Sequence, residues 1–428
     1  MIKNKVKSAL SGSTVTQRIF VIGTLALLLH CMLAFGLTEG RSFFSLLHPD
    51  RNDTLMDFFN SIYDATYEDP YVEKGNIYPA LCFLFYKFFG KLLNQDFFTA
   101  LQWRNDQAGL VLYTFLLIFS CLVLYKLIRI RDDGSLVEKL FPVVLLLGTV
   151  PFWYCFERGN IILQMLILLL FFLRFYKSEN KFLREAALIC LAISVSIKIY
   201  PVFFGLLLIK DKMWKEASRC VLYGAAVFFL PFFLYDGFGS VIQMVENIFA
   251  TDAKMQTFGL GYRVNISNTL DFLSRWTGLD LIPSDTFTFA FVGVTTAITL
   301  IFTKEAWKVQ AALAGAIILV AGFSYTYCLI YMVLPLVTFF EKGESHGFLD
   351  KVYMILFVCM FAPFAFGGVD PLGLGTDCLY PLGATTIISS LALALMVVML
   401  TVEAIYRVVR PKIAEHIAAR AAKNAQSA

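Results

Sequence analysis

The chain has 428 residues, of which 58% are apolar and only 16% charged, and its net charge is +4. Soluble domains average about 45–50% apolar and about 25% charged residues, so this composition excludes a disordered chain and argues against a single soluble core. Long apolar runs recur from one end to the other, which predicts an all-α, polytopic membrane protein.

Twelve apolar segments are candidate spans, because about 20 apolar residues cross a bilayer core about 30 Å thick. They are 18–37, 107–130, 139–156, 160–176, 185–198, 199–210, 218–235, 285–303, 307–322, 325–340, 351–367 and 381–406. Pro201 separates a short pair, which fits two tilted spans or a broken hairpin lining a cavity. We expect one transmembrane domain over 1–412, with a short cytoplasmic helical tail at 413–428 on the inner leaflet surface.

Lys and Arg set the orientation of the spans, because cytoplasmic loops are enriched in both. The basic segments are the N-terminal tail and the connections 174–184, 210–219 and 407–423. Placing all of them in the cytoplasm puts both termini inside. The two long outer loops are then 38–106 and 236–284, and the expected location is the plasma membrane.

One apolar segment, 77–93, falls inside the first outer loop. Under this orientation it must begin and end outside, so we expect a surface helix or a shallow re-entrant helix. If it is a true span, the orientation fails somewhere downstream.

Acidic residues concentrate in the first outer loop, with ten of the 32 in 38–106 and seven in 50–73. Within it, 54–65 is predicted as a short amphipathic helix that Asp53 or Thr54 could cap. Its two faces are Leu55, Phe58, Phe59 and Ile62 on one side, and Asp57, Asn60, Ser61 and Asp64 on the other. The plain interpretation is a solvated acidic face. The alternative is that Asp57 is a general base that takes the proton of an acceptor hydroxyl.

Four cations lie on the predicted outer side, against the positive-inside bias: Arg158, Lys198, Arg263 and Arg275. A cluster of them facing a cavity would bind an anion, and a lipid phosphate is the anion available at that depth. Each alone also fits an interface anchor, and Glu157 could form a local ion pair with Arg158.

Signals for a cofactor are weak. The nine Cys lie mostly in apolar runs without a C-x-x-C pair, and the four His are not at ligand spacing. Asp53, Asp57 and Asp64 could hold a divalent metal, but we favour no cofactor, because cations of the protein can hold a phosphate. Nothing indicates nucleic-acid binding.

Four short motifs follow one another in a defined order: Asp57-Phe58, Tyr78-Pro79, Gly159-Asn160 and Lys198-Ile199-Tyr200-Pro201. Their order and spacing resemble glycosyltransferase family 87, polytopic enzymes of the GT-C superfamily, over roughly residues 50–400. The aromatic run Tyr325-Thr326-Tyr327, followed by a span with Pro335, is also similar to that family's late region.

The resemblance implies an inverting transfer of a mannose- or arabinofuranose-like sugar from a polyprenyl-phosphate donor. The acceptor would be a glycan or glycolipid at the outer face of the plasma membrane, in contact with membrane lipid. Asp57 matches the family's catalytic aspartate. The residues expected to bind substrate are Arg158, Asn160, Lys198, Arg263, Asp64 and Tyr78.

Two departures from the family pattern bear on the donor sugar. This chain has Tyr78-Pro79-Ala80 where the family usually has Tyr-Pro-Pro, and Gly159-Asn160 where it often has Gly-Gln.

Two other functions fit parts of the pattern. A transporter or flippase of lipid-linked sugars would also have many spans and membrane charges, but transport sites tend to lie near the midplane, whereas these charges gather at one face. A polysaccharide polymerase or ligase would place its key Arg and His residues in a large late outer loop. Here 236–284 contains Arg263 and Arg275 but no His.

Overall fold

The computed structural model describes residues 12–42, 46–47, 51–129, 134–256, 263–281, 285–322, 324–341, 347–365 and 383–426. The protein is 80% helical, and the described ranges contain no strand, which confirms the all-α class. The Gly-rich stretch 368–380 lies outside these ranges.

The first half of the chain folds into short and long helices in alternation. In order they are α2 (Val15–Leu37), η2 (Arg51–Asp53), α3 (Met56–Asp64), α4 (Pro70–Lys74), α5 (Ala80–Gly90), α6 (Ala100–Asn105), α7 (Gln107–Ile128), α8 (Leu136–Leu147), α9 (Val150–Arg158), α10 (Ile162–Phe175), α11 (Lys181–Ile197), η3 (Tyr200–Gly205) and α12 (Leu206–Lys210). The second half continues with α13 (Trp214–Phe229), η4 (Leu230–Leu234), α14 (Phe238–Gln256), α15 (Ile266–Thr277), α16 (Asp285–Phe302), α17 (Ala306–Val320), η5 (Thr326–Met332), α18 (Val333–Glu341), α19 (Phe348–Phe361) and α20 (Ala384–Gln426).

Within the described ranges, four helical segments are long and apolar enough to cross a membrane: Val15–Leu37, Gln107–Ile128, Trp214–Leu234 and Ala384–Pro411. The pair α8 and α9 makes a fifth if it is one span bent by 41°. The bend falls where Gly148 ends α8 and Pro151 lies in the first turn of α9. Most other apolar helices have 10–17 residues, so membrane character is established while the twelve spans stay a prediction.

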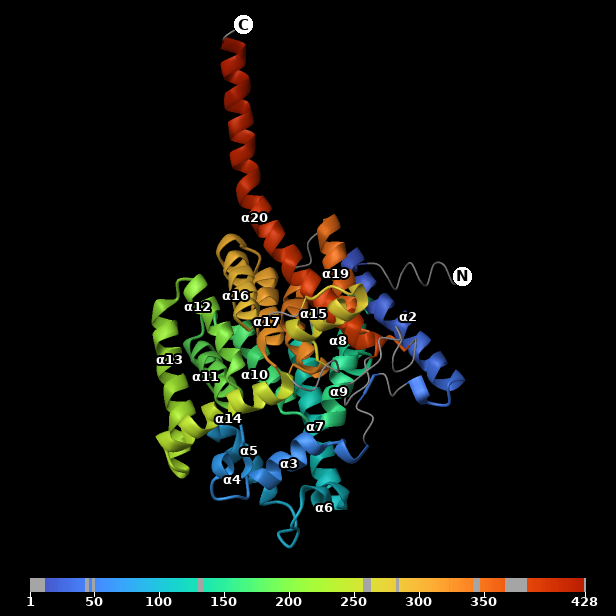
Figure 1. The fold of residues 1–428 in the computed structure, drawn as a ribbon, viewed down its shortest axis with the longest axis vertical. Helices are drawn as coiled ribbons and strands as arrows, with labels where there is room; N and C mark the ends of the chain where they lie inside the picture. Colours follow the sequence, from blue (N-terminus) through green and yellow to red (C-terminus); the bar gives the residue numbers. More distant parts are fainter. Residues whose placement is uncertain are drawn as a thin grey trace.

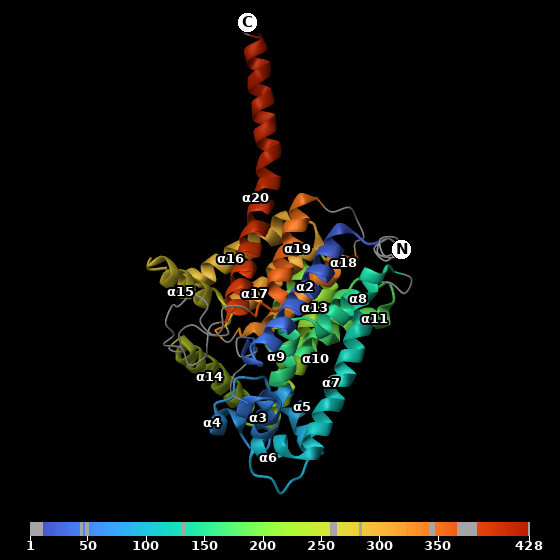
Figure 2. The same ribbon diagram turned by 90° about the vertical axis from the view of Figure 1, so that its right-hand side faces the viewer.

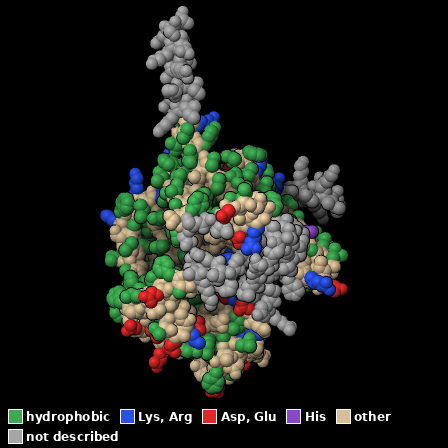
Figure 3. Space-filling view, in the orientation of Figure 1, with side chains coloured by type: hydrophobic (Ala, Val, Ile, Leu, Met, Phe, Trp, Pro, Cys, Tyr) green, Lys and Arg blue, Asp and Glu red, His purple; other side chains and the backbone are tan. Residues whose placement is uncertain are grey.

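The short helices α3 to α6 gather at one end of the molecule, and the long helix α20 projects from the other (Figures 1 and 2). In the space-filling view, Asp and Glu side chains concentrate near the end formed by α3 to α6, and hydrophobic side chains cover much of the rest of that face (Figure 3). The acidic first loop is therefore a folded cap of helices. One connected core of buried side chains links this cap to the long helices.

A buried ion network fixes α20 to α17. Lys308, 3% exposed, donates to Glu403 at 2.7 Å and lies 3.0 Å from Glu305, and Arg407 pairs with both carboxylates. Removing one partner of such a network would leave an uncompensated buried charge. The network therefore ties the last helix to the bundle.

Two local predictions, for the start of the helix at 54–65 and for the C-terminal tail, differ from the structure, whereas the short helix in 77–93 agrees with the expectation that this segment does not span the membrane. The helix predicted at 54–65 is Met56–Asp64, and Leu55 occupies its N-cap position without a side-chain cap, so the expected cap by Asp53 or Thr54 is wrong. The segment 77–93 contains only the 11-residue helix α5, about 16 Å long, which is shorter than a bilayer core. The expected separate tail helix is instead the end of α20, which continues through Pro411.

Candidate active site

The apolar face of α3 fixes the direction of Asp57. Phe58, Phe59 and Ile62 are almost fully buried, and the Phe58 ring contacts the rings of Tyr86 and Tyr113 at 5.8 and 5.4 Å. Burying each large side chain contributes about 1.5–3 kcal/mol. The buried face therefore fixes which side of α3 faces the bundle and, with it, the direction of the Asp57 side chain.

A tight turn between α9 and α10 supplies the residues opposite Asp57. Gly159 ends α9 in the left-handed conformation, with φ of 68°. The turn is joined to the start of α3, because the Leu55 N–H donates to the Glu157 carbonyl at 2.7 Å. Leu55 itself has a φ of 64°, a strained value for a residue other than glycine. The chain reversal at Gly159 lets the side chains of Arg158 and Asn160 reach the same carboxylate.

Both carboxylate oxygens of Asp57 accept hydrogen bonds. Oδ1 accepts from Arg158 Nε at 3.1 Å and Nη2 at 2.5 Å, and Oδ2 accepts from Asn160 Nδ2 at 2.7 Å. The Asp57 side chain is 20% exposed. A carboxylate offers about four lone-pair positions, so one position, on Oδ2, is left for a hydroxyl.

The guanidinium of Arg158 binds two carboxylates. Besides Asp57, it binds the Asp53 carboxylate and donates to the Asp53 carbonyl at 3.1 Å through Nη1. Four hydrogen bonds thus use most of its five N–H groups. Glu157 lies beyond ion-pair distance from Arg158, so the expected local pair is wrong.

Lys198 follows the last residue of α11 and reaches the same site through Asn160. Its Nζ donates to Asn160 Oδ1 at 3.4 Å, and it lies 5.5 Å from the Tyr78 ring centre and 5.7 Å from that of Tyr327. Burial, and then the negative charge of Asp57, raise the pKa of Tyr78, so the phenol stays neutral beside the cation. Within the described part of the chain, no carboxylate lies within 4 Å of Lys198, and two of its three N–H groups have no partner.

The other predicted site residues lie elsewhere. Asp64, two turns along α3, accepts from Asn76 at 3.1 Å, and burial raises its pKa against the effect of that hydrogen bond. Arg263 is 8% exposed, pairs through its backbone with Tyr325, and makes no ion pair or hydrogen bond with Asp57. Arg275 pairs with Asp271 at 3.1 Å.

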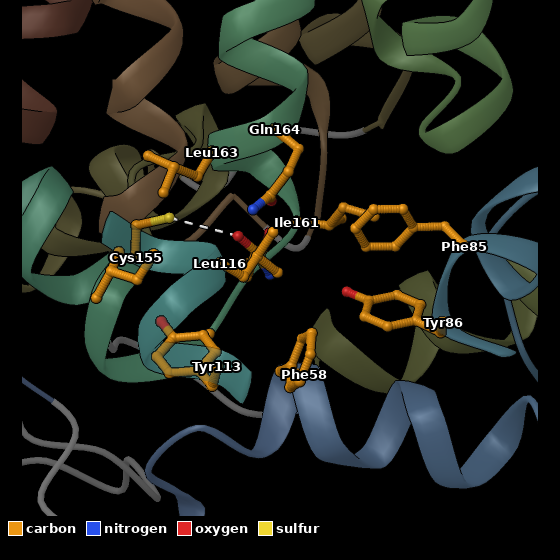
Figure 4. A pocket seen from close by; sticks show the side chains of 12 residues that line it. Phe58, Phe85, Tyr86, Tyr113, Leu116, Cys155, Ile161, Leu163 and Gln164 are labelled. Carbon is orange, nitrogen blue, oxygen red and sulfur yellow. Dashed lines mark hydrogen bonds between the residues drawn. The ribbon is translucent and has the colours of Figure 1, made fainter. Parts of the chain in front are cut away.

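A small pocket lies directly beside Asn160, between α3, α5, α7 and α10, and its volume of about 10 Å³ is roughly that needed for one water molecule (Figure 4). Its wall is mostly aromatic and aliphatic, and includes Phe58, Phe85, Tyr113 and Leu116. The Tyr86 hydroxyl points into it. The pocket thus lies next to Asn160, among helices that include the membrane-span candidate α7.

The carboxylates suggested as metal ligands are separated by other partners. Asp53 and Asp57 meet on Arg158, and Asp64 binds Asn76. Among the residues that the structure describes, no group of three His, Cys, Asp or Glu side chains is arranged to hold a metal ion.

Gly159 makes a direct test of the turn. A Cβ there would lie 2.9 Å from Phe58 Cβ, in addition to the strain at a φ of 68°. We expect Gly159→Ala to lower the free energy of unfolding by about 1–2 kcal/mol for the left-handed conformation and by about 1–3 kcal/mol for overpacking. It should also lower activity, because it displaces Phe58 next to Asp57. The measurement is the thermal unfolding midpoint in detergent, alongside the transfer rate.

Gly75→Ala is the matched control for Gly159→Ala. Gly75 ends α4 with a φ of 65°, but an added Cβ meets nothing within 4 Å. Gly75→Ala should lose only the stability that the left-handed conformation costs, and it should keep full activity. Equal losses in the two variants would mean that the contact with Phe58 is unimportant.

The sequence does not indicate two side chains of the site as such. Its pattern suggests Asp53 as a helix cap or metal ligand, yet Asp53 is the second partner of Arg158. Tyr327 stands out only in a motif shared with the family, and it lies beside Lys198 and stacks on Tyr154 at 5.7 Å. The spacing of these two acids is the sequence signal for a shared partner: Asp53 precedes α3, and Asp57 lies four residues later in its first turn.

Comparison with known proteins bears on the identity of this site. The profile of glycosyltransferase family 87 matches residues 77–335, more than half of the chain. No curated protein and no solved structure shows a significant match. The chain therefore belongs to glycosyltransferase family 87 and is a membrane glycosyltransferase, which decides between the enzyme and the flippase in favour of the enzyme.

Proposed function

We propose that the protein transfers a mannose- or arabinofuranose-like sugar from a polyprenyl-phosphate donor to a glycan or glycolipid acceptor, with inversion. The observation that carries this proposal is the joining of Asp57 to Lys198 through one side chain, Asn160. A proton acceptor and a cation with free donors thus lie on opposite sides of a single amide.

Asp57 is the general base of the proposed reaction. The acceptor hydroxyl occupies the free position on Oδ2, gives its proton to Asp57 as its oxygen bonds to the anomeric carbon, and the bond from that carbon to the phosphate oxygen breaks. The displaced polyprenyl phosphate leaves as a stable anion, so no strong general acid is required. Attack from the face opposite the phosphate inverts the anomeric centre.

Lys198 is the proposed phosphate ligand. It has two free N–H groups and no carboxylate partner within the described ranges, whereas Arg158 is occupied by Asp53 and Asp57. Tyr78 and Tyr327 hold the ammonium from two sides without removing its charge. We keep Arg158 and Asn160 as residues around the reacting groups, and Asp64 and Arg263 as contacts further along the substrates.

We propose that the apolar chain next to the reacting phosphate lies along the helices beside Asn160, where the side chains are mostly aromatic and aliphatic. We further propose that Asp57 faces the outside of the plasma membrane with both termini in the cytoplasm. The position of the α3–α6 cap opposite the projecting end of α20 supports this orientation (Figure 2).

The test is transfer by purified protein in vesicles, with radiolabelled polyprenyl-phosphate mannose and polyprenyl-phosphate arabinofuranose as separate donors and a membrane glycolipid extract as acceptor. Labelled glycolipid should form with one of the two donors. A protein that moves the donor across the bilayer without forming labelled product would instead be a flippase. Labelling of single cysteines in 38–106 from the cytoplasmic side alone would overturn the orientation.

A further inference from the structure

We propose that Asp53 is a positioning residue that keeps Arg158 paired while Asp57 accepts a proton. This inference rests on the proposed role of Asp57 and adds a residue to it. It starts from an arrangement in which one guanidinium lies between two carboxylates.

The arrangement poses a chemical problem for a base. Arg158 donates twice to Asp57 Oδ1, and its side chain is only 13% exposed. If Arg158 had Asp57 as its sole partner, protonation of Asp57 would leave a mostly buried cation without a counter-ion, which is costly. An ion pair of that kind holds a carboxylate in its charged form and makes it a poor proton acceptor.

Asp53 removes this difficulty. Both its carboxylate and its backbone carbonyl bind Arg158 Nη1, on the side of the guanidinium away from Nε. When Asp57 takes the proton, Arg158 and Asp53 remain as a neutral pair in the same place. The guanidinium then stays fixed against Oδ1 and keeps Oδ2, with its free position, directed at the acceptor.

Other groups also act on Asp57 and have to be held constant in a test. Those interacting with it are Glu157 and Cys155 of α9, Lys198 through Asn160, Tyr78 and Tyr86 near or in α5, Tyr113 of α7, and Tyr327 and Cys328 of η5. Substituting Asp53 leaves all of them in place.

The experiment compares Asp53→Asn with wild type by infrared titration of the carboxyl C=O band that is absent in Asp57→Asn. Loss of the Asp53 charge leaves Asp57 as the sole anionic partner of Arg158, so the midpoint of this titration should move to lower pH. The acidic limb of the pH profile of kcat should move in the same direction. The plateau kcat should fall by up to about tenfold, because Asp57 becomes a weaker base, while the donor KM stays within about twofold.

A merely structural role predicts a different result. If Asp53 only holds the loop, its removal would loosen Arg158 from Asp57, and the midpoint would stay or move to higher pH, which would overturn the proposal. Asp53→Glu keeps the charge and should titrate like wild type; a shift equal to that of Asp53→Asn would overturn the proposal too. Asp96→Asn, an exposed acid of the same loop, is the control with unchanged activity.

The infrared titration needs no turnover. If the wild type transferred no sugar from either donor, the proposed function would fail while the titration still decided whether Asp53 and Asp57 share Arg158. If transfer occurred and the midpoints of wild type and Asp53→Asn coincided, only the role of Asp53 would fail.

Discussion

Asp57→Asn is expected to lower kcat about a thousandfold, the middle of the range for loss of a general base. The amide has almost the shape of the carboxylate but cannot accept the hydroxyl proton. Donor KM should change little, because the proposed phosphate ligand, Lys198, contacts Asn160 and not Asp57. The measurement is the initial rate of labelled glycolipid formation over a series of donor concentrations.

The folded state should survive this change. Arg158 keeps Asp53 as a partner, so no buried cation loses its counter-ion. The purified variant should elute as wild type does in size-exclusion chromatography, and its unfolding midpoint should lie within a few degrees of the wild-type value. Asp96→Asn carries the same chemical change at an exposed position of the first loop and should keep full rate. If Asp57→Asn were as active as this control, Asp57 would not be the base.

The helical class and the amphipathic face of α3 could be predicted from the sequence because both depend on local pattern. Phe58, Phe59 and Ile62 recur at helical spacing, and the structure buries all three. The start of α3 could not be predicted in this way. Leu55 takes a left-handed conformation that its residue type disfavours, and a hydrogen bond to the Glu157 carbonyl, a hundred residues away, accompanies it.

The site was predictable in its parts but not in its pairing. Cations on the outer side indicate Arg158 and Lys198, since charge there is costly unless it is used. The polar face of 54–65 and the family resemblance indicate Asp57. Which cation serves which anion depends on a turn geometry set by Gly159, and no sequence pattern expresses that. Arg158, one of the four cations that could bind the lipid phosphate, instead lies on two carboxylates, whereas Lys198 keeps two N–H groups without a partner in the described part of the chain.

Lys198→Met is therefore expected to lower kcat/KM for the donor about 10- to 100-fold. Hydrogen bonds to charged groups contribute about 1.5–3 kcal/mol, and about 1.4 kcal/mol corresponds to a factor of ten. Methionine is an unbranched side chain of similar length that removes the charge. The loss should appear mainly in donor KM and much less in acceptor KM, and initial rates with each substrate varied in turn will separate the two.

Lys74→Met distinguishes a phosphate ligand from any outer cation held by aromatic rings. Lys74 lies above Tyr63 and Tyr67 at 5.0 and 4.2 Å, so it shares the aromatic setting of Lys198. It is exposed, and none of its contacts reaches Asp57 or Asn160. Its loss should leave donor KM unchanged, whereas Lys198→Arg, which keeps the charge with a different geometry, should recover part of the lost affinity. Equal donor KM in Lys198→Met, Lys74→Met and wild type would remove Lys198 from the phosphate site and return that role to another cation, with Arg263 the first to test.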